Sequence, residues 1–549
     1  MSLMESVDVV VVGAGAAGMT AALAAARHGL DVVLIEKADR FGGSTARSGG
    51  GVWVPGNDVL QAAGVEDTPA DAAAYLAHIT GPDVDDELRQ AFLEAGPDMV
   101  RFVLANTPLE MRWVTGYSDY YPEAPGGKPG GRSIEPRPMD ARVLGPDVHT
   151  LAEPYLRAPT GMAVTQADYR WMNLMARHPR GLARAARVAG RRLVSLARRR
   201  RLLTMGLALA GGLRAGLRAA DVPVRLNTPL TGLSVVDGRV TGVETADGTI
   251  HARRGVILAS GGFEHNERMR KEYQRAPIGT EWTVGAVSNT GDGIDAGLRL
   301  GAATAVMDDA WWGPSIVLPR GPYFCLAERT LPGCVLVSQQ GERFVNEAAP
   351  YVDAVHAMYD NHTDEAGHIP CWLVADQRYR NRYIFAGLGP RQPFPGRWYK
   401  SGAVHRAGTL AGLAERIGVP PDALEKTVQR FNGFAASGVD EDFHRGESAY
   451  DRYYGDPRNK PNPCLAPVDK PPFYAVRIVP GDLGTKGGLR TDPRARVLRA
   501  DGTHIPGLYA AGNAAAPVMG RTYAGPGATL GPAMTFGYLA ALDLVGANE

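Results

Sequence analysis

Residues 7–36 constrain the fold of this chain more than any other segment. An apolar, β-branched run over residues 7–12 is followed at once by three glycines in the spacing Gly-x-Gly-x-x-Gly. Gly13 permits a tight turn, Gly15 lets the backbone approach a phosphate, and Gly18 lets a helix pack closely on the preceding strand. This order predicts a strand, a turn and a helix of the kind that binds a dinucleotide.

The rest of this segment completes a strand–helix–strand unit. A helix-prone run over residues 16–28 is followed by a second apolar run, residues 32–35, which ends on Glu36. The predicted helix would present free N–H groups and the positive end of its dipole to a pyrophosphate, with Ala16 and Ala17 nearest to it. Glu36 can accept hydrogen bonds from ribose hydroxyls. The predicted fold class is α/β with α+β elements, built on a Rossmann-like domain.

Two loops indicate which dinucleotide binds. Residues 41–51 read Phe-Gly-Gly-Ser-Thr-Ala-Arg-Ser-Gly-Gly-Gly, and residues 507–513 form an apolar run that ends in Ala-Gly-Asn. Both resemble loops of flavoproteins that bind FAD in an extended form, so FAD is the expected cofactor. The resemblance places against FAD the residues Lys37, Gly43, Ser44, Thr45, Ser48, Gly49, Gly50, Gly512 and Asn513. Relatives with covalent flavin carry a histidine near the first loop. Ser44 and Thr45 stand there in this chain, which predicts non-covalent FAD.

The FAD-binding domain is predicted to consist of three separate segments. These are residues 1–164, 219–309 and 484–549, while residues 310–483, which are richer in aromatic residues, prolines and charge, form an inserted catalytic domain. Within the second segment, alternating apolar residues and Asp-Gly turns predict a small β-meander, followed by an apolar strand over residues 255–262. Gly261, Asp292 and Leu530 are further expected contacts of FAD.

Composition excludes several classes of protein. The chain has 549 residues, 45% of them hydrophobic, and a net charge of +1, which suits several domains with sizeable cores. Its four cysteines form no Cys-x-x-Cys pair, so we expect neither a metal site nor a disulfide framework, and the cytoplasm is the simplest compartment. We expect no signal peptide, and no apolar run reaches the roughly 20 residues that span a bilayer.

Residues 165–218 form a strongly basic segment in an otherwise nearly neutral chain. Asp168 is its one acidic residue, and apolar side chains alternate with its many arginines. We interpret the segment as a basic amphipathic helical insertion that contacts an anionic membrane surface from the cytoplasmic side. A solvated helical hairpin over the FAD domain is the alternative. Nucleic acid is not an expected partner, because few aromatic residues lie among the arginines to stack on bases.

Three segments carry tyrosines beside glycine or proline. Residues 116–123 read Gly-Tyr-Ser-Asp-Tyr-Tyr-Pro-Glu, residues 341–351 end in Ala-Ala-Pro-Tyr, and residues 521–527 read Arg-Thr-Tyr-Ala-Gly-Pro-Gly. With these motifs the chain resembles bacterial 3-ketosteroid Δ1-dehydrogenases (3-oxosteroid 1-dehydrogenases), within the fumarate reductase/succinate dehydrogenase flavoprotein superfamily. The resemblance extends over most of the chain outside residues 165–218.

The resemblance implies that hydrogen is removed from C1 and C2 in ring A of a 3-ketosteroid. A C–H group beside a carbonyl becomes acidic only when the developing enolate oxygen is stabilised. The resemblance gives that role to the Tyr523 hydroxyl and the Gly527 N–H. It makes Tyr351 the base that takes the C2 proton, with Tyr120 as its partner, and flavin N5 the acceptor of the C1 hydride. Since a free tyrosine has a pKa of about 10, Tyr351 needs a neighbour that favours the phenolate.

Other interpretations of the same residues stay open. A tyrosine beside glycine or proline is usually a packed loop residue, and Trp311, Trp312, Tyr323 and Phe324 suit a core as well as a steroid slot. The alternative functions are a Δ4-(5α)-ketosteroid dehydrogenase, a fumarate-type reductase, and a membrane-docked flavin module that relays electrons. A membrane contact would make a quinone a candidate electron acceptor.

Overall fold

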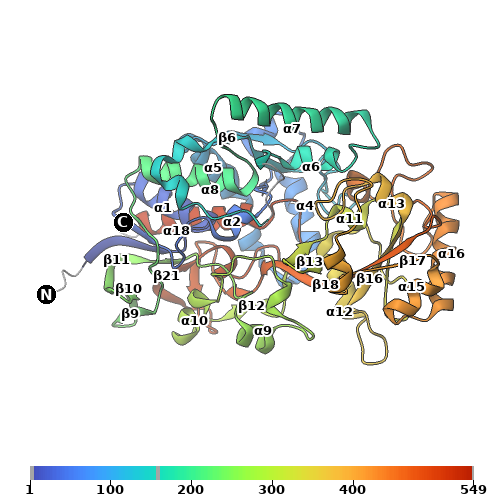
Figure 1. Cartoon of the computed structure of the whole chain (residues 1–549). Helices are drawn as coiled ribbons and strands as arrows, with labels where there is room; N and C mark the ends of the chain where they lie inside the picture. The colour runs from blue at the N-terminus through green and yellow to red at the C-terminus, as the bar shows by residue number, and fades with distance from the viewer. Residues whose placement is uncertain (1–4, 156–160, 547–549) are drawn as a thin grey trace.

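The computed structural model describes residues 5–155 and 161–546 (Figure 1). Its largest sheet has the strand order β20-β21-β11-β1-β2-β8. The strands are β1 (Glu5–Val12), β2 (Val32–Ile35), β8 (Val224–Arg225), β11 (Gly248–Leu258), β20 (Arg496–Leu498) and β21 (His504–Ala510). All neighbouring pairs from β21 to β8 are parallel. Distant parts of the sequence therefore form one sheet, and the predicted α/β fold is confirmed.

The two faces of this sheet are both buried. In β1, Val9 and Val11 pack in the cluster that includes residues of α1 (Ala16–Arg27) and α18 (Leu530–Gly546). Val10 and Val12 pack on the opposite side, in a cluster that includes residues of α10 (Asp292–Arg299). Successive side chains of a strand point to opposite faces, so a strand covered on both sides needs an unbroken apolar run. This explains the valines of residues 9–12.

The predicted β-meander is present, but one strand boundary is wrong. β9 (Gly232–Val236) and β10 (Arg239–Thr245) are antiparallel, and β10 is antiparallel to the first part of β11. We expected a separate strand over residues 255–262. Instead, β11 is one long strand that pairs with β10 at its start, pairs with β1 along its length and ends at Leu258. The chain then leaves the sheet in a turn, where Gly261 has a φ of 81° that favours glycine.

The inserted segment contains a second sheet, coloured yellow to orange-red in Figure 1. Its order is β14-β13-β18-β16-β15, with β17 also paired to β18. The strands are β13 (Ala310–Leu318), β14 (Gly321–Phe324), β15 (Cys334–Val337), β16 (Cys371–Asp376), β17 (Val404–Ala407) and β18 (Phe473–Thr485). β13 leads into this segment and β18 leads out of it, and the two strands pair antiparallel from Ala310–Thr485 to Ile316–Ile478. Paired strands therefore join the two halves of the molecule.

Helices cover both sheets. Those of the FAD-binding half include α2 (Gly43–Arg47), α3 (Asp58–Ala62), α4 (Pro69–Thr80), α5 (Asp86–Asn106) and α9 (Glu267–Tyr273). Those of the inserted half are α11 (Ala327–Thr330), α12 (Tyr351–Asp360), α13 (Gln377–Arg382), α14 (Gly396–Lys400), α15 (Leu410–Ile417), α16 (Pro421–Ser437) and α17 (Ala449–Tyr454). Within the described residues, no helix is long and apolar enough to cross a membrane.

The basic segment divides into a surface part and a core part. Helices α6 (Gln166–Met172) and α7 (Pro179–Ala197) lie on the surface, where α7 forms the upper edge of the molecule in Figure 1. Helix α8 (Met205–Ala219) instead packs on α1 and α2, and its Leu209 and Leu213 are fully buried. Only α6 and α7 therefore have the exposure that a surface contact requires.

Candidate active site

A cavity of about 1340 Å³ is lined by residues of both halves of the molecule. A site for one small ligand measures roughly 300–1,000 Å³, so this cavity has room for a cofactor and a substrate together. Among the predicted cofactor contacts, the lining residues are Gly13, Gly15, Ala16, Ala17, Glu36, Lys37, Gly43, Ser44, Thr45, Ser48, Gly49, Gly50, Gly261, Asp292, Gly512, Asn513 and Leu530. Gly18 lies behind them, where a Cβ would be 2.0 Å from the carbonyl oxygen of Gly13. Its role is therefore close packing of α1 on β1.

The glycine turn after β1 has the shape that a pyrophosphate needs. Gly13 has a φ of 108°, and a Cβ there would lie 2.3 Å from the carbonyl oxygen of Ala259. Gly15 is open by contrast, because a Cβ there would meet only Thr45 Oγ1, at 3.7 Å. Among the described residues, Gly43 has no neighbour within 4 Å of a Cβ. The backbone at the start of α1 therefore faces open space, as helix N-termini that bind phosphate do.

Charged groups lie at one end of this cavity. Glu36 accepts hydrogen bonds from the backbone N–H groups of Ala14 and Ala38, both at 2.9 Å. Burial raises the pKa of the Glu36 carboxyl, and these two N–H groups oppose that rise. The Lys37 ammonium lies 2.7 Å from an oxygen of Asp292, so these two predicted contacts pair with each other.

Unsatisfied polar atoms test whether FAD fits. Ser260 Oγ and Gln166 Oε1 are buried without a hydrogen-bond partner in the described part of the chain, and both residues line the cavity. Buried polar atoms without partners usually mark a place where a ligand or water binds. Together with the open glycine turn and Glu36, these atoms fit the phosphate, ribose and ring groups of FAD.

Three tyrosines from distant segments meet in the same cavity. The ring centroids of Tyr120 and Tyr351 are 5.4 Å apart, those of Tyr120 and Tyr523 are 5.1 Å apart, and those of Tyr351 and Tyr523 are 5.4 Å apart. Tyr120 lies in a loop after β4 (Met111–Trp113), Tyr351 is the first residue of α12, and Tyr523 lies in the loop before α18. All three line the cavity.

The environment of these tyrosines keeps them neutral. Burial raises the pKa of Tyr351 well above its usual value, Tyr523 raises it further, and the Tyr120 hydroxyl lowers it. Burial likewise raises the pKa of Tyr120 and of Tyr523. A phenol at this site therefore gives up its proton only where a hydrogen-bond partner or a positive charge stabilises the phenolate.

Gly527 and Tyr523 form a compact pair of hydrogen-bond donors. Gly527 has a φ of 102°, and a Cβ there would lie 2.4 Å from the backbone carbon of Gly51. The Tyr523 hydroxyl accepts a hydrogen bond from Thr529 Oγ1 at 3.0 Å, and the backbone N–H of Gly527 lowers the pKa of this hydroxyl. The Tyr523 hydroxyl and the Gly527 N–H therefore lie next to each other, and two adjacent donors are what an oxyanion hole requires.

The structure shows which of several neighbouring aromatic residues line the cavity and which pack elsewhere. Tyr121, the sequence neighbour of Tyr120, is not among the described residues that line the cavity, and it donates to Asp353 Oδ1 at 2.8 Å. Trp311 lines the cavity with its ring 5.0 Å from that of Tyr523, whereas Trp312 packs against Tyr359 in the core. The two tryptophans are neighbours in a strand, so they point to opposite faces.

Several lining residues were not identified from the sequence. Besides Tyr323 and Phe324, the cavity is lined by Tyr117, Tyr155, Met162, Tyr169, Leu388, Trp398 and Tyr454. Tyr454 donates a hydrogen bond to the Tyr117 hydroxyl at 3.1 Å, and the Tyr155 hydroxyl accepts one from the backbone N–H of Phe324 at 2.8 Å. The adjacent tyrosines at residues 453 and 454 are the one feature of the sequence that could have indicated an aromatic lining here. No local pattern links these segments, because only the fold brings them together.

Comparison with known proteins decides the family. The chain matches the FAD binding domain family over residues 8–530. It is 59% identical to a 3-oxosteroid 1-dehydrogenase of Mycobacterium tuberculosis and 58% identical to one of Mycolicibacterium smegmatis, in both cases over 98% of this chain and at least 97% of the relative. The chain belongs to the family of FAD-dependent 3-oxosteroid 1-dehydrogenases.

A solved structure of this dehydrogenase family has the same fold. The 3-ketosteroid Δ1-dehydrogenase of Sterolibacterium denitrificans, determined in complex with 1,4-androstadiene-3,17-dione, is 41% identical, with a TM-score of 0.94. The match covers 99% of this chain and 100% of that chain. The residues that these matches leave uncovered are far fewer than the residues of the basic segment 165–218, so the matches extend into that segment. The likeness to these dehydrogenases therefore includes the segment that the resemblance seen in the sequence left out, as in those family members that are expected to carry such an insertion.

Proposed function

We propose that the protein catalyses the FAD-dependent 1,2-dehydrogenation of 3-ketosteroids. The observation that supports this function most is the meeting of Tyr120, Tyr351 and Tyr523, with ring centroids 5.1–5.4 Å apart, in the cavity that the FAD loops also line. Aromatic and aliphatic side chains surround them, which suits a flat, apolar substrate with one ketone to be recognised.

In this proposal the C3 carbonyl of the steroid accepts hydrogen bonds from the Tyr523 hydroxyl and the Gly527 N–H. These donors stabilise the negative charge that develops on the oxygen as C2 loses its proton. Tyr351 accepts that proton on its oxygen while its own hydroxyl proton passes to Tyr120, which is in contact with it. Tyr120 in turn releases a proton towards solvent, so both phenols end neutral. FAD, held without a covalent bond by the glycine turn after β1, Glu36 and the loop around Ser44, would supply the oxidant, with N5 as the acceptor of the C1 hydride.

The product identifies the reaction. The flavin of the purified enzyme is mixed with androst-4-ene-3,17-dione without oxygen, and the steroid is then analysed by nuclear magnetic resonance. We expect the flavin absorbance to bleach and a 1,2-double bond to form. A new double bond elsewhere in ring A would favour the Δ4-(5α)-dehydrogenase alternative, and recovery of the oxidised-flavin absorbance when fumarate is added to dithionite-reduced enzyme would favour a fumarate-type reductase. Failure of every 3-ketosteroid to bleach the flavin would overturn the proposal.

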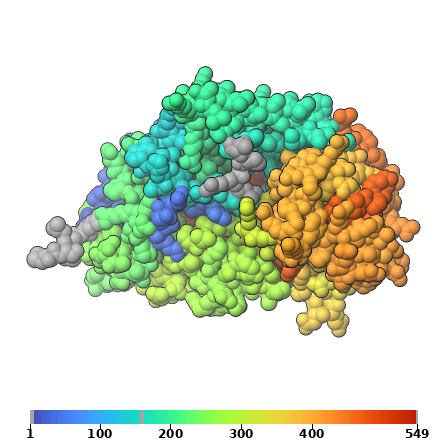
Figure 2. All heavy atoms as spheres, viewed as in Figure 1, coloured from blue at the N-terminus to red at the C-terminus, as the bar shows by residue number. Residues whose placement is uncertain are grey.

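We further propose that α7 holds the enzyme on the cytoplasmic face of a membrane. Arg184 and Arg191 point inward and pair with Asp168, at 3.2 and 2.9 Å. The outward face is apolar instead, with Leu182 62% exposed and Leu193 67% exposed. In Figure 2 the basic segment forms a continuous band of atoms along the upper edge of the molecule. An exposed apolar helix face with arginines at its borders suits insertion among anionic lipid headgroups.

This position would bring the flavin close to lipid-soluble electron carriers. The cavity is lined by Arg192 and Ser195 of α7 as well as by the FAD loops. A membrane quinone is therefore our proposed acceptor for the electrons that the steroid gives up. Substrates with a steroid skeleton also concentrate in lipid, so one contact would serve both partners of the reaction.

A further inference from the structure

Arg329 lies fully buried beside the segment that carries Tyr351. It belongs to the short helix α11, and none of its surface is exposed. Its Nη1 donates to the carbonyl oxygens of Glu347, at 2.5 Å, and Ala349, at 2.8 Å. These carbonyls come directly before Pro350 and the first turn of α12. One guanidinium nitrogen therefore fixes the backbone from which Tyr351 projects.

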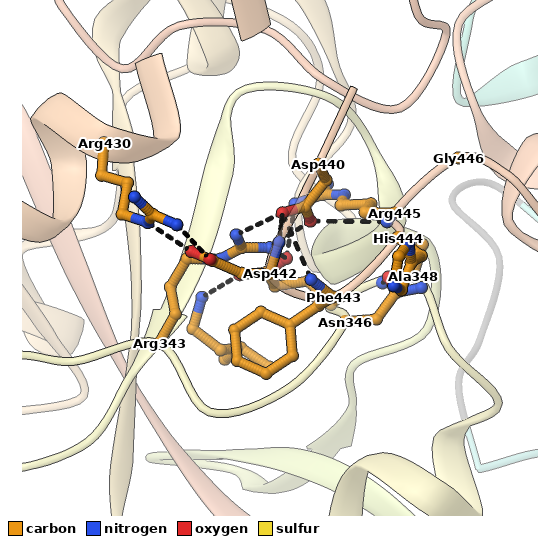
Figure 3. Close-up of polar contacts among 12 residues, drawn as sticks. Arg343, Asn346, Ala348, Arg430, Asp440, Asp442, Phe443, His444, Arg445 and Gly446 are labelled. Carbon is orange, nitrogen blue, oxygen red and sulfur yellow. Dashed lines mark hydrogen bonds and ion pairs between the residues drawn. The ribbon is translucent and has the colours of Figure 1, made fainter. Parts of the chain in front are cut away.

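The side chain of Glu347 is held as firmly as its backbone. Its carboxylate, also without exposed surface, lies 2.8 Å from Arg343 Nη2 and 3.0 Å from Arg445 Nη1. Figure 3 shows Arg343 reaching Asp440 in the same group, with a separation of 2.8 Å. Arg445 also donates to the backbone carbonyls of Cys334 and Leu331. Charges this deeply buried tolerate little displacement, because an unpaired charge there is costly. The segment before Tyr351 is therefore anchored on both sides.

The charge of Arg329 also acts on Tyr450, the neighbour of Tyr120. Arg329 Nε and Nη2 are buried without a hydrogen-bond partner in the described part of the chain, and the same is true of the Tyr450 hydroxyl. Burial raises the pKa of Tyr450, and the positive charge of Arg329 is the largest opposing cause. The Tyr450 ring lies 4.7 Å from the ring of Tyr120. Arg329 thus reaches Tyr351 through the backbone and Tyr120 through Tyr450.

We infer that Arg329 is a positioning residue that aligns Tyr351 and Tyr120 with each other. One edge of its guanidinium sets the start of α12, and the other edge restrains Tyr450 against Tyr120. Arg329 does not line the cavity, so it acts through these neighbours and not on the steroid. The inference rests on the proposed function, in which Tyr351 removes the C2 proton. A displacement of about 1 Å at such a base can cost about 10²-fold in rate.

The test compares Arg329→Met with Arg329→Lys in single-turnover flavin reduction by a 3-ketosteroid, unlabelled or deuterated at C2. We expect Arg329→Met to lower the limiting rate constant at least about tenfold while KM changes less than about threefold. We also expect it to increase the isotope effect at C2, because proton removal becomes slower than the hydride step. Arg329→Lys keeps one donor and a charge, so it should restore part of the rate.

The control is Arg254→Met. Arg254 Nη1 also donates to two backbone carbonyls, those of Leu544 and Val545, but far from the tyrosines in sequence and sheet position. We expect this variant to keep the wild-type rate constant and isotope effect. A merely structural role of Arg329 would reduce the amount of flavin-loaded protein and leave the rate constant per bound flavin and the isotope effect unchanged, which would overturn the inference.

Two further variants keep the outcome decisive. Should Arg329→Met yield no flavin-loaded protein, Tyr450→Phe carries the test, with a smaller rate loss and the same rise in isotope effect expected. A wild-type rate constant and isotope effect in Tyr450→Phe would then overturn the inference. The proposed function fails if no 3-ketosteroid reduces the flavin of the wild-type enzyme, and Tyr351→Phe tests the base role: if this variant reduces flavin at the wild-type rate, Tyr351 is not the base. If Tyr351→Phe is inactive while the Arg329 and Tyr450 variants behave as wild type, only the positioning role fails.

Discussion

The hydroxyl of Tyr351 lies among other phenols, and burial raises its pKa well above the usual tyrosine value. The residue is therefore neutral at physiological pH, and removal of its proton becomes more favourable as the pH rises. We expect the limiting rate constant for flavin reduction to increase between about pH 6 and 9, by at most about tenfold per unit. Anaerobic stopped-flow absorbance across this range measures it. A rate constant independent of pH would contradict the role of Tyr351 as the base.

A second prediction at the scale of one residue concerns Gly527. A Cβ at this position would lie 2.4 Å from the backbone of Gly51, so Gly527→Ala must displace the N–H that faces Tyr523. Loss of one oxyanion donor lowers kcat by about 10²–10³-fold, and we expect a loss of that order in steady-state dehydrogenation of a 3-ketosteroid.

Gly502→Ala is the matched control for this substitution. Gly502 also has a positive φ, of 83°, but a Cβ there has no neighbour within 4 Å in the part of the chain that the structure describes. The control should lose about 1 kcal/mol of stability and keep its activity. Equal activity of the two variants would show that the Gly527 N–H is not required.

At the scale of elements, α7 exposes its apolar face and turns Arg184 and Arg191 inward. We expect Leu182→Glu combined with Leu193→Glu to abolish sedimentation with vesicles that contain anionic lipid, because two charges would enter the apolar face. Steroid dehydrogenation with a soluble electron acceptor should stay unchanged, since both side chains point to solvent.

Val236→Glu is the control for this helix. Val236 is an equally exposed apolar residue, 57% accessible, but it ends β9 on another part of the surface. It should leave vesicle binding as in wild type. Wild-type binding by the α7 double variant would instead leave α7 as a solvated helix, the alternative considered from the sequence.

At the scale of the whole molecule, Glu264 is buried where the FAD-binding half meets the end of β18. Its carboxylate accepts hydrogen bonds from Asn289 Nδ2, at 2.6 Å, and from the backbone N–H of Thr485, at 3.4 Å. Burial, and then the charge of Asp482, raise its pKa to about 7. An unfolded glutamate has a pKa of about 4.3, so between these values the folded protein binds more protons. The free energy of unfolding therefore falls as the pH rises through this window.

We expect Glu264→Gln to remove this loss, which amounts to at most about 3 kcal/mol above pH 7. Denaturant unfolding of the flavin-loaded protein at both ends of the window measures it. The variant should gain stability relative to wild type as the pH increases. Glu267→Gln, which removes an exposed carboxylate on α9, should show no such gain. A constant difference between Glu264→Gln and wild type would mean that Glu264 is ionised throughout.

The whole fold also shows how far the sequence could be interpreted. The strand and helix of residues 7–36 follow from local patterns, because both faces of β1 are buried and the glycines are required by sterics. The start of β11 could not be predicted, because the same strand pairs with β10 in the meander and with β1 in the main sheet. The convergence of Tyr120, Tyr351 and Tyr523 was available only through resemblance to a family. Tyr155 and Tyr169 were missed because packing between distant segments, and no motif, brings them to the cavity.

The most direct test of the account is the rate of flavin reduction in Tyr351→Phe, measured in a single turnover with a 3-ketosteroid. The control is Tyr121→Phe, because Tyr121 neighbours Tyr120 in sequence but bonds to Asp353 outside the cavity. The account predicts at least about 10²-fold slower reduction in Tyr351→Phe with FAD still bound, and a nearly wild-type rate in Tyr121→Phe. Flavin reduction at the wild-type rate in Tyr351→Phe would contradict it.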